Sequence, residues 1–166
     1  SDPSGQTRFI EKHGLTKYKL HPQFPFNSIT LQRMLYAADQ DGRGVQFVEA
    51  MLPAIWEDGV DVLDQAALSA AVTAAGFDAK DLFERSQTDE VKQGLIKNTE
   101  NAVERGTFGI PTMFVGPKGK GEMFFGKERL DQIEEELTAQ AEGYGFMATS
   151  LLMRLIGYLS RCYAQL

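Results

Sequence analysis

Apolar residues recur three or four positions apart through most of the chain, the spacing that one face of an α-helix requires. Helices are predicted to begin near Asn27 or Ser28, Asp64, Asp78 and Thr88, where a short side-chain oxygen can accept a hydrogen bond from the first turn. The clearest stripe, in which we expect the tryptophan to lie in the core, consists of Val45, Phe47, Val48, Met51, Leu52, Ile55 and Trp56. Residues 1–105 are therefore predicted to form a mainly helical domain.

The pattern changes in residues 106–130, the only stretch that predicts β-structure. Two short apolar runs, 112–115 and 122–125, flank the sequence Gly-Pro-Lys-Gly-Lys-Gly, which is typical of a turn. The two runs are therefore predicted to pair as an antiparallel hairpin. Helical spacing returns after it at Leu130, Ile133 and Leu137, so residues 106–140 are predicted to be a hairpin followed by a helix.

Two shorter stretches near the N-terminus are less regular. Residues 15–20, in which Tyr18 and Leu20 alternate with lysines, predict a short extended segment. Residues 21–26 contain two prolines and two phenylalanines, which predicts an ordered loop. We expect Phe24 and Phe26 to be buried anchors of that loop rather than ligand contacts.

Residues 141–166 form the third predicted part, an amphipathic tail helix. The tail from 143 onward contains Arg154 and Arg161 but no acidic residue, and its apolar positions at helical spacing are Leu151, Leu152, Leu155, Ile156 and Leu159. Such a helix can pack on its own domain, lie on a membrane surface or dock on a partner.

Charge and cysteine content exclude several classes of function. The formal net charge of −6 argues against a nucleic-acid-binding surface, which needs a basic stripe. Cys162 is the only cysteine, so no intramolecular disulfide, no Cys-x-x-Cys motif and no cysteine-based zinc site is possible within the chain, and no metal site is expected. No apolar run is long enough to span a membrane, and residues 1–12 are polar, so a cytoplasmic protein without a signal peptide is expected.

Ile110-Pro111-Thr112 is the most informative point of the predicted hairpin. A proline before a strand either begins the strand in the trans form or sits in a cis peptide bond, which is the form of only about 5% of such bonds. A cis bond would expose the backbone N–H and C=O of Ile110 to an extended peptide. The sequence pattern alone leaves both forms open.

Three segments, 22–27, 55–61 and 106–130, together resemble the family of 2-hydroxychromene-2-carboxylate isomerases and kappa-class glutathione transferases. That family belongs to the DsbA-like group, so the resemblance implies an α/β thioredoxin-like fold interrupted by a helical domain. It also implies a first strand–helix–strand half that supplies a catalytic serine. This chain contains no matching segment, so we expect it to be a truncated form with the catalytic residue unknown.

The resemblance implies a glutathione-dependent isomerase of aromatic hydroxy acids, with glutathione as cofactor and an aromatic small molecule as substrate. Positions that match the family's glutathione-binding site are Asn27, Ile110, Pro111, Lys127 and Glu128. A thiol–disulfide oxidoreductase is a rival that the missing Cys-x-x-Cys disfavours, and a non-catalytic interaction module is another. Asn27 also reads as a simple helix cap, and Lys127 and Glu128 as charges that complement the helix dipole.

The run 112–115 is apolar on both faces, which is typical of a strand inside a sheet. Its expected neighbour would be the first strand of the missing half. We therefore expect an open sheet edge, and with it possible homodimer formation or self-association through that edge or through the tail helix.

Overall fold

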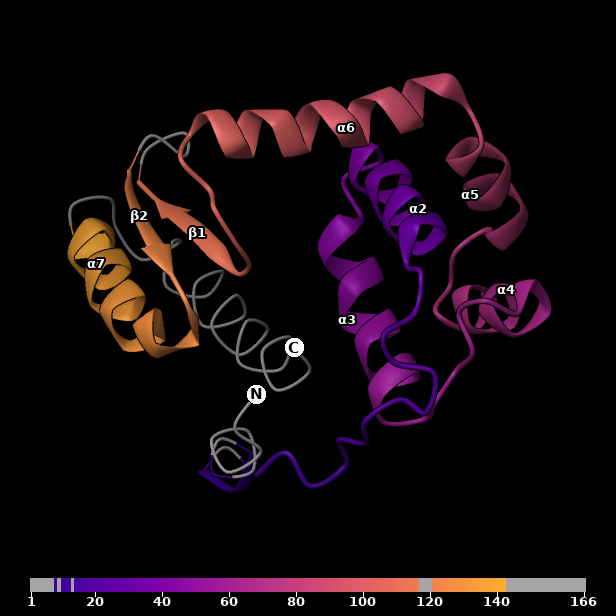
Figure 1. The fold of residues 1–166 in the computed structure, drawn as a ribbon, viewed down its shortest axis with the longest axis horizontal. Helices are drawn as coiled ribbons and strands as arrows, with labels where there is room; N and C mark the ends of the chain where they lie inside the picture. The colour runs from indigo at the N-terminus through magenta and orange to yellow at the C-terminus, as the bar shows by residue number, and fades with distance from the viewer. Residues whose placement is uncertain (1–7, 9, 13, 117–120, 143–166) are drawn as a thin grey trace. The chain divides into compact units, whose positions relative to one another are not determined.

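A computed structural model describes residues 8, 10–12, 14–116 and 121–142. The chain divides into two compact units (Figure 1). Residues Thr16–Glu104 form the helical unit. The other unit contains Arg105 onward, and we refer to its described part, 105–142, as the hairpin unit. The division into three parts that the sequence predicts, 1–105, 106–140 and 141–166, stays a prediction.

The helical unit contains five helices: α2 (Ile29–Gln40), α3 (Gly44–Trp56), α4 (Gln65–Ala74), α5 (Ala79–Ser86) and α6 (Asp89–Glu104). Helix α2 is central, because it packs against α3, α5 and α6. The apolar stripes that predict these helices point into one core, whose most buried members include Met34, Phe47, Val72, Leu82 and Val91. Trp56 is buried in this core, as expected.

Side chains cap the first turns of α4 and α5 where the sequence predicts. Oδ1 of Asp64 accepts hydrogen bonds from the backbone N–H of Ala66 at 2.8 Å and of Ala67 at 3.3 Å. Oδ1 of Asp78 accepts one from Asp81 at 3.0 Å. Each cap satisfies an N–H that has no partner within its helix, and such a cap is worth about 1 kcal/mol.

Two local predictions near the N-terminus are wrong. Residues 15–20 form a turn and an irregular segment instead of an extended strand, and the N–H of Lys19 donates to the carbonyl of Trp56 at 2.7 Å. Phe24 is 45% exposed and so is not a buried anchor, whereas Phe26 is half-buried. Both rings pack against Trp56, with centroid distances of 5.7 and 6.0 Å. The loop therefore covers Trp56 and leaves one ring partly in solvent.

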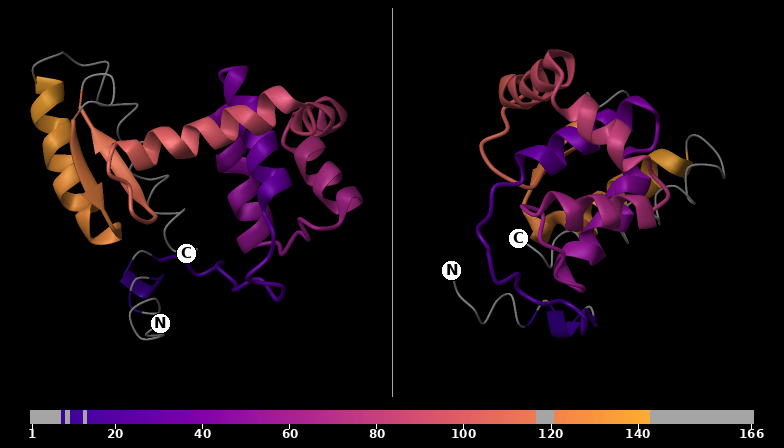
Figure 2. Two further views of the ribbon diagram at one scale, coloured as in Figure 1. Left: turned by 45° about the horizontal axis from the view of Figure 1, so that its top comes forward. Right: turned by 90° about the vertical axis from the view of Figure 1, so that its right-hand side faces the viewer.

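In the hairpin unit, β1 (Thr112–Val115) pairs antiparallel with β2 (Glu122–Phe125), and Thr112 lies opposite Phe125. Helix α7 (Leu130–Glu142) follows β2 and packs on one face of the hairpin (Figure 2). Its core on that face consists of Val115, Phe124 and Ile133, with Met113 and Leu137 against them. Because side chains alternate along a strand, the opposite face carries Thr112, Phe114, Met123 and Phe125. The predicted hairpin and following helix are confirmed.

Lys127 and Glu128, which the sequence also allows as charges that complement the helix dipole, lie before the α-helix. Residues Lys127–Arg129 form a short 3-10 turn, η2, and the α-helix begins at Leu130. The predicted turn residues 117–120 and the tail 143–166 lie outside the described residues. None of the described helices combines the length and apolar character needed to cross a membrane.

Candidate functional site

The candidate site is built around the loop that enters β1. The peptide bond between Ile110 and Pro111 is cis. The carbonyl of Pro111 accepts a hydrogen bond from the N–H of Gly126 at 3.1 Å, which ties the loop to the end of β2. Oγ1 of Thr112 donates to the carbonyl of Gly109 at 2.7 Å. The loop is therefore held on both sides of Ile110 by the ends of the hairpin.

Ile110 itself points outward and is 74% exposed. Within the described part of the chain, its backbone N–H and C=O form no hydrogen bond. A backbone donor and acceptor fixed at a loop in this way can pair with an extended peptide, as an added strand does.

Glu128 lies at the same end of the hairpin. Gly126 has φ of +96°, a conformation that residues with a side chain rarely adopt. A Cβ built on Gly126 would lie 2.7 Å from Oε2 of Glu128, so the carboxylate lies over the Gly126 backbone. The N–H of Gly126 donates to the carbonyl of Pro111, so the backbone over which Glu128 lies is tied to the Ile110–Pro111 loop. The side chain of Lys127 lies outside the described residues.

Asn27 belongs to the helical unit and is not placed relative to the other four residues. Its Oδ1 accepts a hydrogen bond from the N–H of Ile29 at 3.0 Å, at the start of α2. Ser28, the residue before the helix, makes no capping hydrogen bond with its side chain. The cap role that the sequence also allows for Asn27 is therefore the one that its contacts support.

Sequence reasoning missed an exposed pair of rings next to Ile110. Phe108 is 71% exposed, Phe125 is 40% exposed, and their ring centroids are 4.5 Å apart. We call this pair the aromatic shelf. The sequence contains one signal for it, a large apolar residue between Thr107 and Gly109 in a polar, glycine-rich loop. Farther along the same face of the hairpin, the guanidinium of Arg105 lies 3.5 Å from the ring centroid of Phe114.

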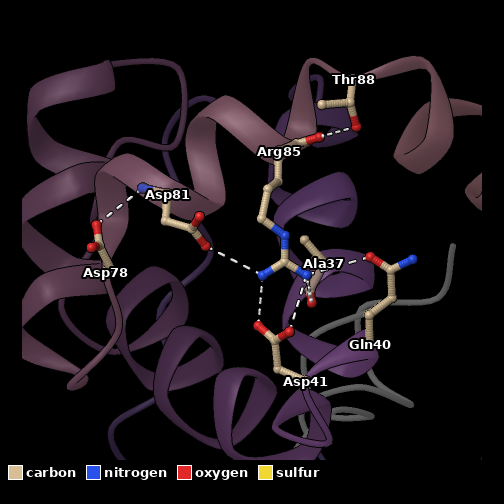
Figure 3. A network of polar contacts seen from close by, with 7 residues as sticks. All are labelled: Ala37, Gln40, Asp41, Asp78, Asp81, Arg85 and Thr88. Atoms are coloured by element: carbon tan, nitrogen blue, oxygen red, sulfur yellow. Dashed lines mark hydrogen bonds and ion pairs between the residues drawn. The ribbon is translucent and has the colours of Figure 1, made fainter.

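A separate polar cluster lies in the helical unit (Figure 3). Arg85 of α5 contacts Asp41 at 2.6 Å, Asp81 at 3.2 Å and the carbonyl of Ala37 at 2.8 Å. The hydrogen bond from Arg85 lowers the pKa of the Asp41 carboxyl, and the same contact raises the pKa of Arg85. The cluster satisfies the C-terminal end of α2, so we interpret it as a structural clamp. No group of three or more side chains suited to holding a metal occurs among the described residues.

Comparison with known proteins places these features in a family. The model of the DSBA-like thioredoxin domain matches residues 8–138. A 2-hydroxychromene-2-carboxylate isomerase of Sphingobium xenophagum is 36% identical over 103 residues, 62% of this chain and 50% of that protein. An isomerase of the same name from Pseudomonas sp. (strain C18) is 30% identical over 120 residues, 70% of this chain and 54% of that protein.

Human glutathione S-transferase kappa 1 is 31% identical over 80 residues, which cover 46% of this chain and 35% of that protein. The chain thus spans about half the length of the curated isomerases that it matches. The matched region includes both the helical unit and most of the hairpin unit.

Proposed function

Because this chain belongs to the DSBA-like thioredoxin domain family, we propose that it is part of a glutathione-dependent isomerase of aromatic hydroxy acids. The observation that carries the proposal is the backbone of Ile110, which forms no hydrogen bond within the described residues, at the same end of the hairpin as Glu128. Since the chain spans about half of the matched isomerases, the activity, the substrate and the cofactor of the whole protein are all part of the proposal.

The residues of the hairpin unit fit glutathione, a γ-linked tripeptide with two carboxylates, one ammonium group and a thiol. The N–H and C=O of Ile110 would pair with its extended backbone, in the orientation that Pro111 fixes. Glu128 would bind the ammonium through a charge-assisted hydrogen bond. Lys127 would offset the charge of a carboxylate, and the binding role that the resemblance implies for Asn27 stays a prediction.

Glutathione supplies a thiol when it is bound, and this chain's residues would hold and orient the peptide that carries it. We assign no catalytic residue in this chain. Cys162 belongs to the tail that lies outside the described residues, and no recognised motif surrounds it. The rival oxidoreductase needs a Cys-x-x-Cys pair, whereas the sequence contains one cysteine.

A titration that removes the two charges one at a time tests the proposed role of Glu128. The ligands are glutathione and its analogue without the α-amino group, and the proteins are the full chain and its Glu128→Gln variant. In the unaltered chain we expect glutathione to bind roughly ten-fold more tightly than the analogue, the size of one charge-assisted contact. In Glu128→Gln the two ligands should bind equally.

Glu135→Gln is the matched control, because Glu135 is an exposed acid on α7 of the same unit. It should keep the ten-fold preference. Equal binding of both ligands to the unaltered chain, or a preference that survives Glu128→Gln, would exclude Glu128 as the ammonium site. Absence of any saturable glutathione binding to the unaltered chain would exclude the glutathione proposal for these residues.

A further inference from the structure

The aromatic shelf and the neighbouring Ile110 expose large apolar side chains to solvent. Ile110 and Phe108 are the two most exposed large hydrophobic residues in the described part of the chain, at 74% and 71%. They lie two positions apart in one loop, and Phe108 contacts the ring of Phe125, which is itself 40% exposed. Burying an aromatic ring is strongly favourable, so rings left in solvent beside a candidate site point to a ligand that covers them.

The local backbone holds the shelf in place. A Cβ at Gly109 would lie only 3.0 Å from Cε2 of Phe125, so the missing side chain lets this ring lie against the loop. The Thr112 hydroxyl fixes the Gly109 carbonyl, and Thr112 is the strand partner of Phe125. The two rings therefore come from different segments, and the hairpin itself fixes their spacing.

We propose that the aromatic shelf binds the planar aromatic ring of the acid on which the protein acts. This inference rests on the proposed function and names the part of the chain that recognises the aromatic substrate. The shelf is continuous with the site for the thiol peptide, because Gly109 alone separates Phe108 from Ile110. On its other side, Phe125 directly precedes Gly126, over which Glu128 lies.

An aromatic ring is the occupant that this geometry favours over a general apolar group. The two phenylalanine rings are tilted by 41°, so a third ring can meet one of them in an offset stack and the other edge-on. Both arrangements are favoured beyond the area that they bury, and a saturated ring gains only the area. Preference for a planar ring over a saturated ring of the same size is therefore the signature of the shelf.

The probes are 2-naphthoate and decahydro-2-naphthoate, which share their carboxylate and carbon skeleton but differ in planarity. Binding to the full chain is followed by amide chemical shifts in NMR spectra, which also report whether each variant is folded. We expect the unaltered chain to prefer 2-naphthoate by roughly 3- to 10-fold. Phe108→Leu and Phe125→Leu keep apolar bulk without the ring, and each should lower that preference towards equality.

Gly109→Ala tests the shelf without changing either ring. The added methyl group should displace Phe125 and reduce the preference, while Phe108 remains. Leu63→Ser is the control, since Leu63 is 57% exposed in the helical unit and should have no effect. If Phe108→Leu gives the dispersed spectrum of a folded protein and keeps the full preference, the proposal is wrong.

A second possible occupant of the shelf is another copy of this chain. In that case saturation with 2-naphthoate would not be reached at any protein concentration, which would also overturn the proposal. Glutathione binding on the same samples separates the two proposals. If the unaltered chain binds glutathione but shows no preference for 2-naphthoate, the shelf proposal alone is refuted. If it shows that preference but does not bind glutathione, the glutathione site alone is refuted.

Discussion

Nη1 of Arg85 donates to Oδ2 of Asp41 at 2.6 Å, across 44 positions of the sequence. The contact joins α5 to the residue that follows α2, and Nη2 adds a hydrogen bond to the carbonyl of Ala37. Ion pairs in full solvent contribute little, but the Arg85 side chain is only 27% exposed and its contacts share one rigid group. We therefore treat this relationship as a stabilising one and test it first.

Replacing Arg85 by methionine keeps the apolar stem and removes the guanidinium. We expect the free energy of unfolding in urea to fall by about 1–2 kcal/mol, because several hydrogen bonds to charged and carbonyl groups are lost together. Arg85→Lys should restore little, since an ammonium group cannot reproduce the planar fork. The control is Lys80→Met, which removes an exposed pair with Glu84 at 3.9 Å and should change stability by less than about 0.5 kcal/mol.

The free energy of unfolding should also depend on pH, through the carboxyl group of Asp41. Its pKa is lowered in the folded protein, chiefly by the hydrogen bond from Arg85, so the unfolded chain binds the proton more readily. The stabilisation is thus present above the unfolded pKa of about 3.9 and is lost as pH falls through the lower folded value. Asp41→Asn should flatten the pH dependence of urea unfolding between about pH 5 and pH 2. Asp58→Asn, at an exposed position outside this cluster, is the control.

The pKa of a second carboxyl group, that of Asp61, is also lowered in the folded protein and can be tested independently. The side chain of Gln23 donates to it at 2.7 Å and is the main cause of its lowered pKa, followed by the N–H of Leu63. Gln23→Ala should raise the pKa of Asp61 towards its ordinary value, as measured by NMR titration of the carboxyl carbon. An unchanged titration curve would contradict the hydrogen bond seen here.

Gly126 should control glutathione binding through Glu128. Gly126→Ala places a methyl group 2.7 Å from Oε2 of Glu128, which is too close, so the carboxylate must move away. We expect weaker glutathione binding, together with the cost of about 1 kcal/mol or more that alanine incurs at positive φ. Gly59→Ala is matched for the backbone, because φ is +75° there and its Cβ would meet open space. It should lower stability and leave glutathione affinity unchanged.

We also expect the chain to self-associate through the outer edge of β1. Among the described residues β1 pairs only with β2, so its other edge presents unpaired backbone groups. The mass measured by analytical ultracentrifugation should rise with concentration. Phe114→Lys should oppose this, because lysines on an edge strand discourage pairing. Val103→Lys, at an exposed position of α6, should not. A monomer at every concentration would rule out the edge as a contact between copies. Self-association through the tail helix is tested separately by deleting residues 143–166.

The sequence determined the elements whose signals are local. Residues three or four positions apart share a helix face in any fold, so the apolar stripes identify α2 to α7 before any packing is known. The caps at Asp64 and Asp78 and the glycine-rich break between β1 and β2 depend on neighbours within a few positions. The candidate positions at Ile110 and Glu128 come instead from the resemblance of residues 106–130 to a known family, and their role in binding stays a prediction.

Which of these residues meet and which remain in solvent depends on how the helices and strands pack. Arg85 finds Asp41 because α2 and α5 pack together, and no local pattern contains that distance. In the sequence Phe24 and Phe108 look no different from the buried phenylalanines, yet both are exposed in the structure. Glu128 lies over Gly126, whose φ turns positive at the end of β2. The N–H of Gly126 also binds the carbonyl of Pro111 in the loop before β1. Burial and long-range contacts depend on how whole elements pack, and that information is spread over the entire chain.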